Sequence, residues 1–281
     1  MTDTIGTDAG PDAEAGVAAR REGEILVILL NRPEVHNSLD PVSMAALRRI
    51  LEQFRDDSGL AVAVITGAGE RAFCAGSDLR RTPPAGAPFA AALLGPWQDE
   101  VEQGGYVRAI ALSEIDVGKP LIAAVNGHAA GGGLEIALAC HLRIASTNAT
   151  FSLPEARWAS VPAAGGLSTL LRAVPPAVAM KMLLTGDRID AAEALRVGLV
   201  SDVVEPGALL SLALSLARRI ASNGPLSVRA IAALAKRSYD LPLTQAIAFE
   251  QTMWGLLRDT ADRAEGRAAF SERRDPTYGG H

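Results

Sequence analysis

Three consecutive glycines, Gly131–Gly133, separate an apolar run at residues 121–125 from a helical run at residues 136–140. This order predicts a buried strand, a sharp glycine turn and then a helix whose first amides have no intrahelical partner. Those amides carry the positive end of the helix dipole, so they could stabilise an oxyanion. Glu135 follows within the first helical turn, close enough to act on a group bound there.

Composition narrows the class of protein. The 281 residues are 48% hydrophobic and 21% charged, with a net charge of -5, which is typical of a globular chain and does not favour nucleic-acid binding. The two cysteines, Cys74 and Cys140, show no paired spacing. We therefore expect a reducing, cytoplasmic location without disulfides. The apolar runs are too short or too interrupted to span a membrane, and none is expected to do so.

The pattern of apolar runs predicts an α/β core followed by helices. We expect a disordered tail at residues 1–22, a core at 23–205 and a helical oligomerisation region at 206–281. A proline-rich connection or lid is predicted at residues 82–96. The predicted strands are 24–30, 61–66, 121–125, 141–145, 150–152 and 199–204. The predicted helices start at 41, 105, 136, 167, 176, 190, 208, 225 and 243, the last reaching residue 264 before an irregular end at 267–281.

A rival interpretation starts from residues 67–72, GAGERA, which match the G-x-G-x-x-A dinucleotide pattern directly after a strand. That pattern requires a helix beginning within the glycine turn, and Phe73–Gly76 continues it poorly. The sequence has no P-loop, nucleophile-elbow or HExxH motif. Its four histidines lack metal-ligand spacing, so no metal site is expected and His128 is predicted to be a hydrogen-bonded structural residue.

Four residues form a more specific constellation. Ser77 and Gly132 lie in separate glycine-bearing turns, and each could offer a backbone N–H to one oxygen, as an oxyanion hole requires. Glu135 and Glu155 supply two carboxyl groups. Hydration of a polarised double bond needs such a pair, because one group accepts a proton from water and the other protonates carbon.

These residues stand within motifs that resemble the crotonase family, the enoyl-CoA hydratase/isomerase group. The similar segments are Asn31-Arg32-Pro33, residues 73–79 (FCAGSDL), residues 126–135 (NGHAAGGGLE), Leu153-Pro154-Glu155, residues 162–166 (PAAGG) and residues 270–276 (FSERRDP).

The resemblance implies a crotonase-like spiral of ββα units, with a helical C-terminal region that forms a homotrimer or a dimer of trimers. It also implies an acyl-CoA substrate and no cofactor, since the coenzyme A thioester is itself the substrate. In this family the amides of Ser77 and Gly132 would hold the thioester oxygen, and Glu135 and Glu155 would activate water and protonate the α carbon. A substrate contact strip would comprise Ser77, Asp78, Leu79 and Arg80 together with Gly132.

Three departures from the family pattern concern the acyl group. Ala163 stands where glycine is common, Trp158 where a small aliphatic residue is common, and Arg80 where lysine is frequent. We expect an enoyl-CoA hydratase. The alternatives are a double-bond isomerase, an acyl-CoA hydrolase or another lyase of the same family, since a shared fold does not fix the reaction. A nicotinamide oxidoreductase and a non-catalytic CoA-binding protein are the alternatives from other classes.

Overall fold

The computed structural model describes residues 15–81, 115 and 117–281. The lid expected at residues 82–96 and nearly all of the helix expected at 105–115 lie outside these ranges, as do the first 14 residues of the expected tail. Within the described part, no helix is both long and apolar enough to cross a membrane.

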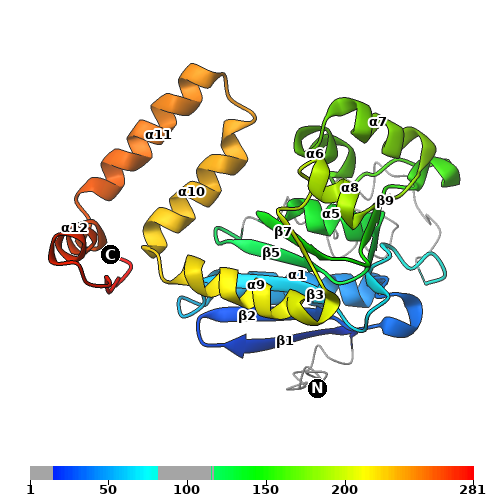
Figure 1. Ribbon diagram of the computed structural model, residues 1–281, viewed down its shortest axis with the longest axis horizontal. Helices are drawn as coiled ribbons and strands as arrows, with labels where there is room; N and C mark the ends of the chain where they lie inside the picture. Colours follow the sequence, from blue (N-terminus) through cyan, green and yellow to red (C-terminus); the bar gives the residue numbers. More distant parts are fainter. Residues whose placement is uncertain (1–14, 82–114, 116) are drawn as a thin grey trace.

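A six-stranded sheet forms the centre of the molecule (Figure 1). Its order is β1-β2-β3-β5-β7-β10; β1 and β2 are antiparallel, and the remaining neighbours are parallel. Parallel strands covered on both faces need apolar side chains on both faces, and β2, β3 and β5 are buried throughout. The strands are β1 Val17–Glu22, β2 Ile25–Leu30, β3 Val62–Gly67, β5 Leu121–Val125, β7 Leu142–Ser146 and β10 Asp202–Val204.

A smaller sheet has the order β4-β6-β8-β9 and is built from β4 Ala72–Cys74, β6 His128–Ala130, β8 Thr150–Ser152 and β9 Ile189–Asp190. The chain alternates between the sheets, because β3, β5 and β7 lie in the large one and β4, β6 and β8 in the small one. The predicted strands include neither β4 nor β6, and this is corrected here: each is only three residues long, and the two pair with each other.

Strand β4 also removes the dinucleotide interpretation. The glycine turn at residues 67–69 leads into a strand and not a helix. Two asparagine side chains hold this crossing: Asn37 donates to the carbonyls of Ala68 and Ala72, and Asn126 donates to the Gly69 carbonyl and accepts from the Gly67 amide.

Helices cover the large sheet on both faces. One face packs with α1 (Pro41–Asp56), whose N-cap Asp40 accepts from the Ser43 amide as the Asp-Pro pair predicts. The other face packs against α9 (Pro206–Ala221). The remaining helices in the described part of the body are α5 Gly132–Ala139, α6 Gly166–Ala173, α7 Pro176–Thr185 and α8 Ala191–Arg196, with short 3-10 turns η2 Pro33–Val35 and η4 Glu155–Trp158.

The last helices, α10 (Pro225–Ser238), α11 (Leu243–Arg258) and α12 (Ala261–Glu272), form an arm that extends away from the sheets in Figure 1. The single helix expected at 243–264 is wrong. The Thr260 side chain accepts from the Arg263 amide and so starts a new helix, which also orders residues 267–272.

The tail expected at residues 1–22 is wrong for its last part. Residues 17–22 form β1, which pairs with β2 through a tight connection at Gly23. Val17 is fully buried in the core, so burial of apolar surface holds this strand in place. The predicted division at residue 205 stays a prediction. Helix α9, which follows it, packs on the body and not with the arm.

Candidate functional site

Two glycine-bearing turns, far apart in the sequence, meet at the ends of β4 and β6. Gly76 has a φ of +87° and lies so close to the second turn that a Cβ there would be 2.9 Å from the Gly132 nitrogen. Its neighbour Ser77 forms a parallel bridge with Leu39. In the second turn Gly131 has a φ of +52° and its amide donates to the Ser152 carbonyl at the end of β8. Only glycine adopts these conformations at low cost.

The carbonyls that precede Ser77 and Gly132 fix the directions of the two amides. The Gly76 carbonyl accepts from the Leu39 amide (2.8 Å), and the Gly131 carbonyl accepts from the Glu135 amide (3.0 Å) within α5. Because C=O and N–H point in opposite directions across a trans peptide, the Ser77 N–H faces away from Leu39 and the Gly132 N–H faces out of the start of α5. Within the described residues, neither amide has a hydrogen-bond acceptor.

A buried ion network holds the Ser77 turn. The Arg32 guanidinium lies 2.9 Å from an Asp78 oxygen and 3.3 Å from an Asp40 oxygen, and it also donates to the Ser38 carbonyl. Burial would raise the pKa of Asp40, but the Ser43 amide and hydroxyl, together with Arg32, lower it overall. The network fixes the residue that follows Ser77, and therefore the turn itself.

Glu135 is buried on the first turn of α5. Its Oε1 accepts two backbone hydrogen bonds, from Ala164 (2.8 Å) and Gly166 (2.9 Å), at the start of α6. Burial raises the pKa of this carboxyl, and the two amides oppose that rise because they stabilise the ionised form.

Glu155 approaches the same place from the small sheet, at the start of η4. A Cβ on Gly131 would lie 2.9 Å from its Oε1, and its Oε2 is buried without a hydrogen-bond partner. Burial raises its pKa to about 7, its own amide lowers it, and the negative charge of Glu135 raises it further. Glu155 therefore lies beside the Gly131 turn, close enough to Glu135 for that carboxylate to affect its ionisation.

The structure thus brings together Ser77, Gly132, Glu135 and Glu155. The other residues of the expected contact strip differ in exposure. Leu79 is 68% exposed and Arg80 is also exposed beside the Ser77 turn. The Asp78 carboxylate is buried and bonded to Arg32 and to the Arg80 amide, so its side chain is turned inward. The predicted contact of Asp78 with substrate stays a prediction, and only its backbone is placed to make that contact.

Two further sequence expectations concern neighbouring residues. Trp158, at the end of η4, is 71% exposed. His128 lies 2.8 Å through its Nδ1 from the Thr150 hydroxyl, so it is hydrogen-bonded as predicted.

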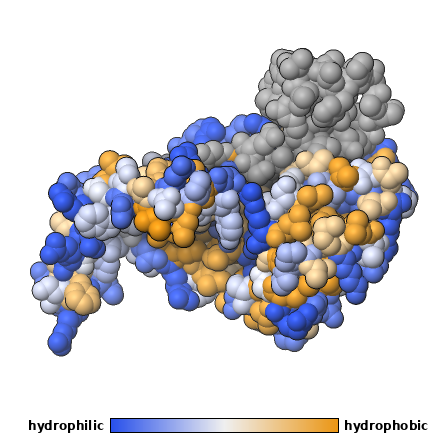
Figure 2. Space-filling model, turned by 90° about the horizontal axis from the view of Figure 1, so that it is seen from above, coloured by the Kyte–Doolittle hydropathy of each residue, from blue (hydrophilic) through white to orange (hydrophobic). Residues whose placement is uncertain are grey.

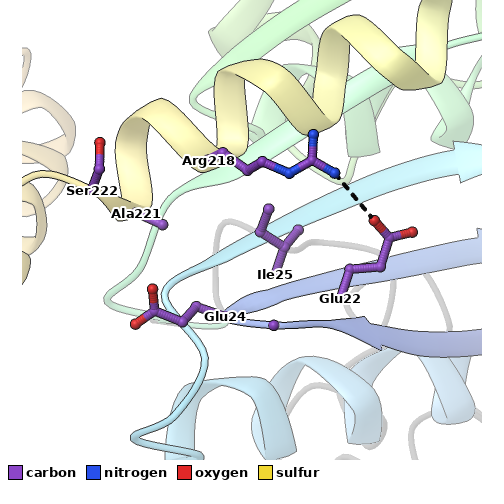
Figure 3. A pocket seen from close by; sticks show the side chains of 7 residues that line it. Glu22, Glu24, Ile25, Arg218, Ala221 and Ser222 are labelled. Atoms are coloured by element: carbon purple, nitrogen blue, oxygen red, sulfur yellow. Dashed lines mark ion pairs between the residues drawn. The ribbon is translucent and has the colours of Figure 1, made fainter.

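A separate pocket of about 520 Å³ lies between the β1–β2 connection and the end of α9 (Figure 3). Glu22 and Arg218, whose nearest charged atoms are 3.8 Å apart, face each other across it. The pocket is not lined by any of the four candidate site residues, Ser77, Gly132, Glu135 and Glu155. It is therefore distinct from the candidate site.

Sequence reasoning missed the groups that hold the site residues in place. Arg32 lies within Asn31-Arg32-Pro33, but nothing in that motif indicates a partner 46 residues later. The amides of Ala164 and Gly166 lie within residues 162–166. The two glycines at the start of a helix in this segment could have indicated a binding position for a carboxylate.

Comparisons with known proteins agree with this geometry. The enoyl-CoA hydratase/isomerase family model matches residues 20–281. An (E)-benzylidenesuccinyl-CoA hydratase from Thauera aromatica is 52% identical, covering 91% of this chain and 96% of its own. A carnitinyl-CoA dehydratase from Salmonella arizonae is 41% identical, covering 93% and 97%.

The crystal structure of an enoyl-CoA hydratase from Bacillus anthracis superposes with a TM-score of 0.85 at 35% identity, covering 95% of this chain and all of that one. The predicted crotonase-like α/β fold is confirmed by this likeness. The chain belongs to the enoyl-CoA hydratase/isomerase family, also called the crotonase family.

Proposed function

We propose that this chain adds water across the 2,3 double bond of an enoyl-CoA thioester, and catalyses the reverse dehydration. The observation that carries the proposal is the approach of a second carboxylate, Glu155, to the Gly131 turn that leads into the helix of Glu135. A hydratase needs both groups, whereas a double-bond isomerase needs one carboxylate to shuttle a proton.

In the proposed reaction the amides of Ser77 and Gly132 hold the thioester oxygen as it gains negative charge. Removing one such donor typically costs about 3–4 kcal/mol of barrier. Glu135 takes a proton from water while the water oxygen bonds to C3, and the C2=C3 electrons move into the enolate. Glu155 then gives its proton to C2. The proton on Glu135 returns to Glu155 to complete the cycle. No metal or redox cofactor takes part, because the thioester itself delocalises the charge.

The environments of the two acids support this division. The amides of Ala164 and Gly166 favour an ionised Glu135, as a base requires. A pKa of about 7 keeps much of Glu155 protonated near neutral pH, as an acid requires.

The acyl group is proposed from the relatives. The substrates named for them are benzylidenesuccinyl-CoA and carnitinyl-CoA, and the first relative is 52% identical to this chain over 256 residues. We propose a substituted enoyl group of this kind in preference to a short straight chain. The cytoplasmic location stays a prediction.

A homo-oligomer is proposed on the exposed apolar side chains of the arm. Figure 2 shows hydrophobic residues along it as well as on the body. Those at least 60% exposed are Ile231, Tyr239, Leu243, Trp254, Leu256 and Phe270. Exposed apolar patches of this kind mark subunit contacts. Light scattering after gel filtration tests the proposal: a trimer or hexamer is expected, and a monomer would contradict it.

The activity test uses a panel of thioesters: benzylidenesuccinyl-CoA, carnitinyl-CoA and a straight-chain enoyl-CoA. For the two enoyl thioesters we expect loss of the conjugated enoyl absorbance and ¹⁸O from labelled water in the product; for carnitinyl-CoA, which is the hydrated form, we expect that absorbance to appear. A shift of the double bond without ¹⁸O would favour the isomerase, and release of free thiol would favour the hydrolase. Thioester binding with no chemical change across the panel would leave only a CoA-binding protein.

A further inference from the structure

One oxygen of Glu135 is anchored and the other is open. Oε1 accepts both backbone hydrogen bonds, from Ala164 and Gly166. Within the described residues Oε2 accepts no hydrogen bond. It is nevertheless not one of the fully buried polar atoms without a hydrogen-bond partner, so it is exposed to solvent. Oε2 is therefore the oxygen that a water molecule can reach.

Both anchoring amides belong to the segment that opens α6. Gly166 is the first residue of that helix, and Gly165 before it has a φ of +102°. The first amides of a helix have no intrahelical acceptor, and they carry the positive end of its dipole. The carboxylate of Glu135 accepts from the first of these donors, Gly166, and from Ala164 two residues before the helix, so α5 supplies the side chain and the start of α6 fixes its orientation.

Residue 166 has no room for a side chain. A Cβ there would lie 2.7 Å from the Glu135 Cγ, 2.8 Å from its Oε1 and 3.0 Å from the Pro162 Cβ. Any larger residue must push the carboxylate or the amide away. The opposite case is Gly207, also in the first turn of a helix, where an added Cβ meets nothing within 4 Å.

We infer that Gly166 is a positioning residue for hydration: its amide, with that of Ala164, holds Oε1 of Glu135 so that Oε2 faces the water. This inference rests on the proposed function. It makes the glycine necessary for two reasons, because it supplies a donor and leaves the space that the carboxylate occupies.

The experiment compares Gly166→Ala with the matched control Gly207→Ala in the full chain. Gly166→Ala should lower kcat by about 10–100-fold while KM for the thioester stays within about threefold, since the Ser77 and Gly132 turns are unchanged. Weaker hydrogen bonds to the anion raise the pKa of Glu135, so the acid limb of kcat/KM should move to higher pH. Gly207→Ala should match the wild type. A purely structural role would lower the melting temperature and leave the acid limb in place.

A second variant guards against misfolding. Ala164→Pro removes the other amide donor without adding a side chain at residue 166, and should shift the acid limb in the same direction. Combining Gly166→Ala with Glu135→Asp gives a further check. The shorter acid withdraws from the added methyl group, so the loss caused by Gly166→Ala should be smaller in that background.

A readout without turnover separates this inference from the proposed function. The Glu135 carboxyl can be titrated by ¹³C NMR of carboxyl-labelled glutamate, with Glu135→Gln assigning the signal. A higher midpoint in Gly166→Ala supports the anchoring of Glu135, even if the wild type hydrates no thioester and the proposed function fails. An unchanged midpoint and an unchanged acid limb would overturn the inference, whatever the activity.

Discussion

Glu135 and Glu155 are the same side chain in two different surroundings. The first begins α5 and meets two backbone donors from α6, whereas the second begins η4 and has a buried oxygen with no donor. Burial raises the pKa of both; two amides from the start of α6 oppose the rise at Glu135, whereas at Glu155 only its own amide opposes it and the charge of Glu135 adds to it. The comparison shows how the backbone can make one carboxyl a base and its neighbour an acid without changing the residue type.

The largest expected effect comes from removing the proposed base. Glu135→Gln keeps an oxygen that can accept from the Ala164 and Gly166 amides, but it cannot take a proton from water. Hydration should fall by about 10²–10⁴-fold in kcat/KM, the usual contribution of a positioned acid or base. Glu24→Gln is the control, since Glu24 is exposed and lines the separate pocket. A loss of less than about threefold would remove Glu135 from the mechanism and favour the isomerase.

A third acid, Asp78, sharpens the comparison because its charge is neutralised by a cation. Arg32→Met would remove the guanidinium that bonds to Asp78 and that shares Asp40 with Arg81, and removing one partner of a buried pair typically costs about 3–5 kcal/mol. We expect a loss of that size in the free energy of unfolding, measured by urea denaturation. Adding Asp78→Asn should recover part of it. No change on Arg32→Met would mean that the network does not hold the Ser77 turn.

The sequence allows the strand-helix order, the four site residues and the family to be predicted, because glycine turns and paired acids have local signatures. It does not predict β4 and β6, since three-residue strands are stable only through pairing with each other. Nor does it predict the partners of Arg32 and Glu135, which the fold brings from 46 and from about 30 residues away. Local patterns identify the reacting groups, whereas tertiary contacts set their ionisation.

The difference between the two acids should appear in the pH profile. Because Glu155 must be protonated and its pKa lies at about 7, kcat/KM should fall about tenfold per pH unit above pH 7. In the Glu135→Gln background the neighbouring charge is gone, so the midpoint of residual activity should move to lower pH. A profile that is flat from pH 6 to pH 9 would contradict the role of Glu155 as the acid.

The smallest expected effect concerns stability. The folded-state pKa of Glu155, about 7, lies above the ordinary value of 4.5, so the folded state binds this proton more tightly than the unfolded state. Wild-type stability should therefore decrease as pH rises from about 4.5 through 7, and then level off. Glu155→Gln removes the buried charge and should raise the melting temperature at pH 8 by about 2–4 °C, the shift that about 1 kcal/mol gives in a domain of this size.

At pH 4 the same substitution should have little effect, because the wild-type carboxyl is largely protonated in both states. Thermal unfolding of the wild type, Glu155→Gln and Glu24→Gln at both pH values measures the difference. An equal rise at pH 4 and pH 8 would assign the gain to packing. A gain confined to pH 8 would assign it to the buried, unpartnered charge that distinguishes Glu155 from Glu135.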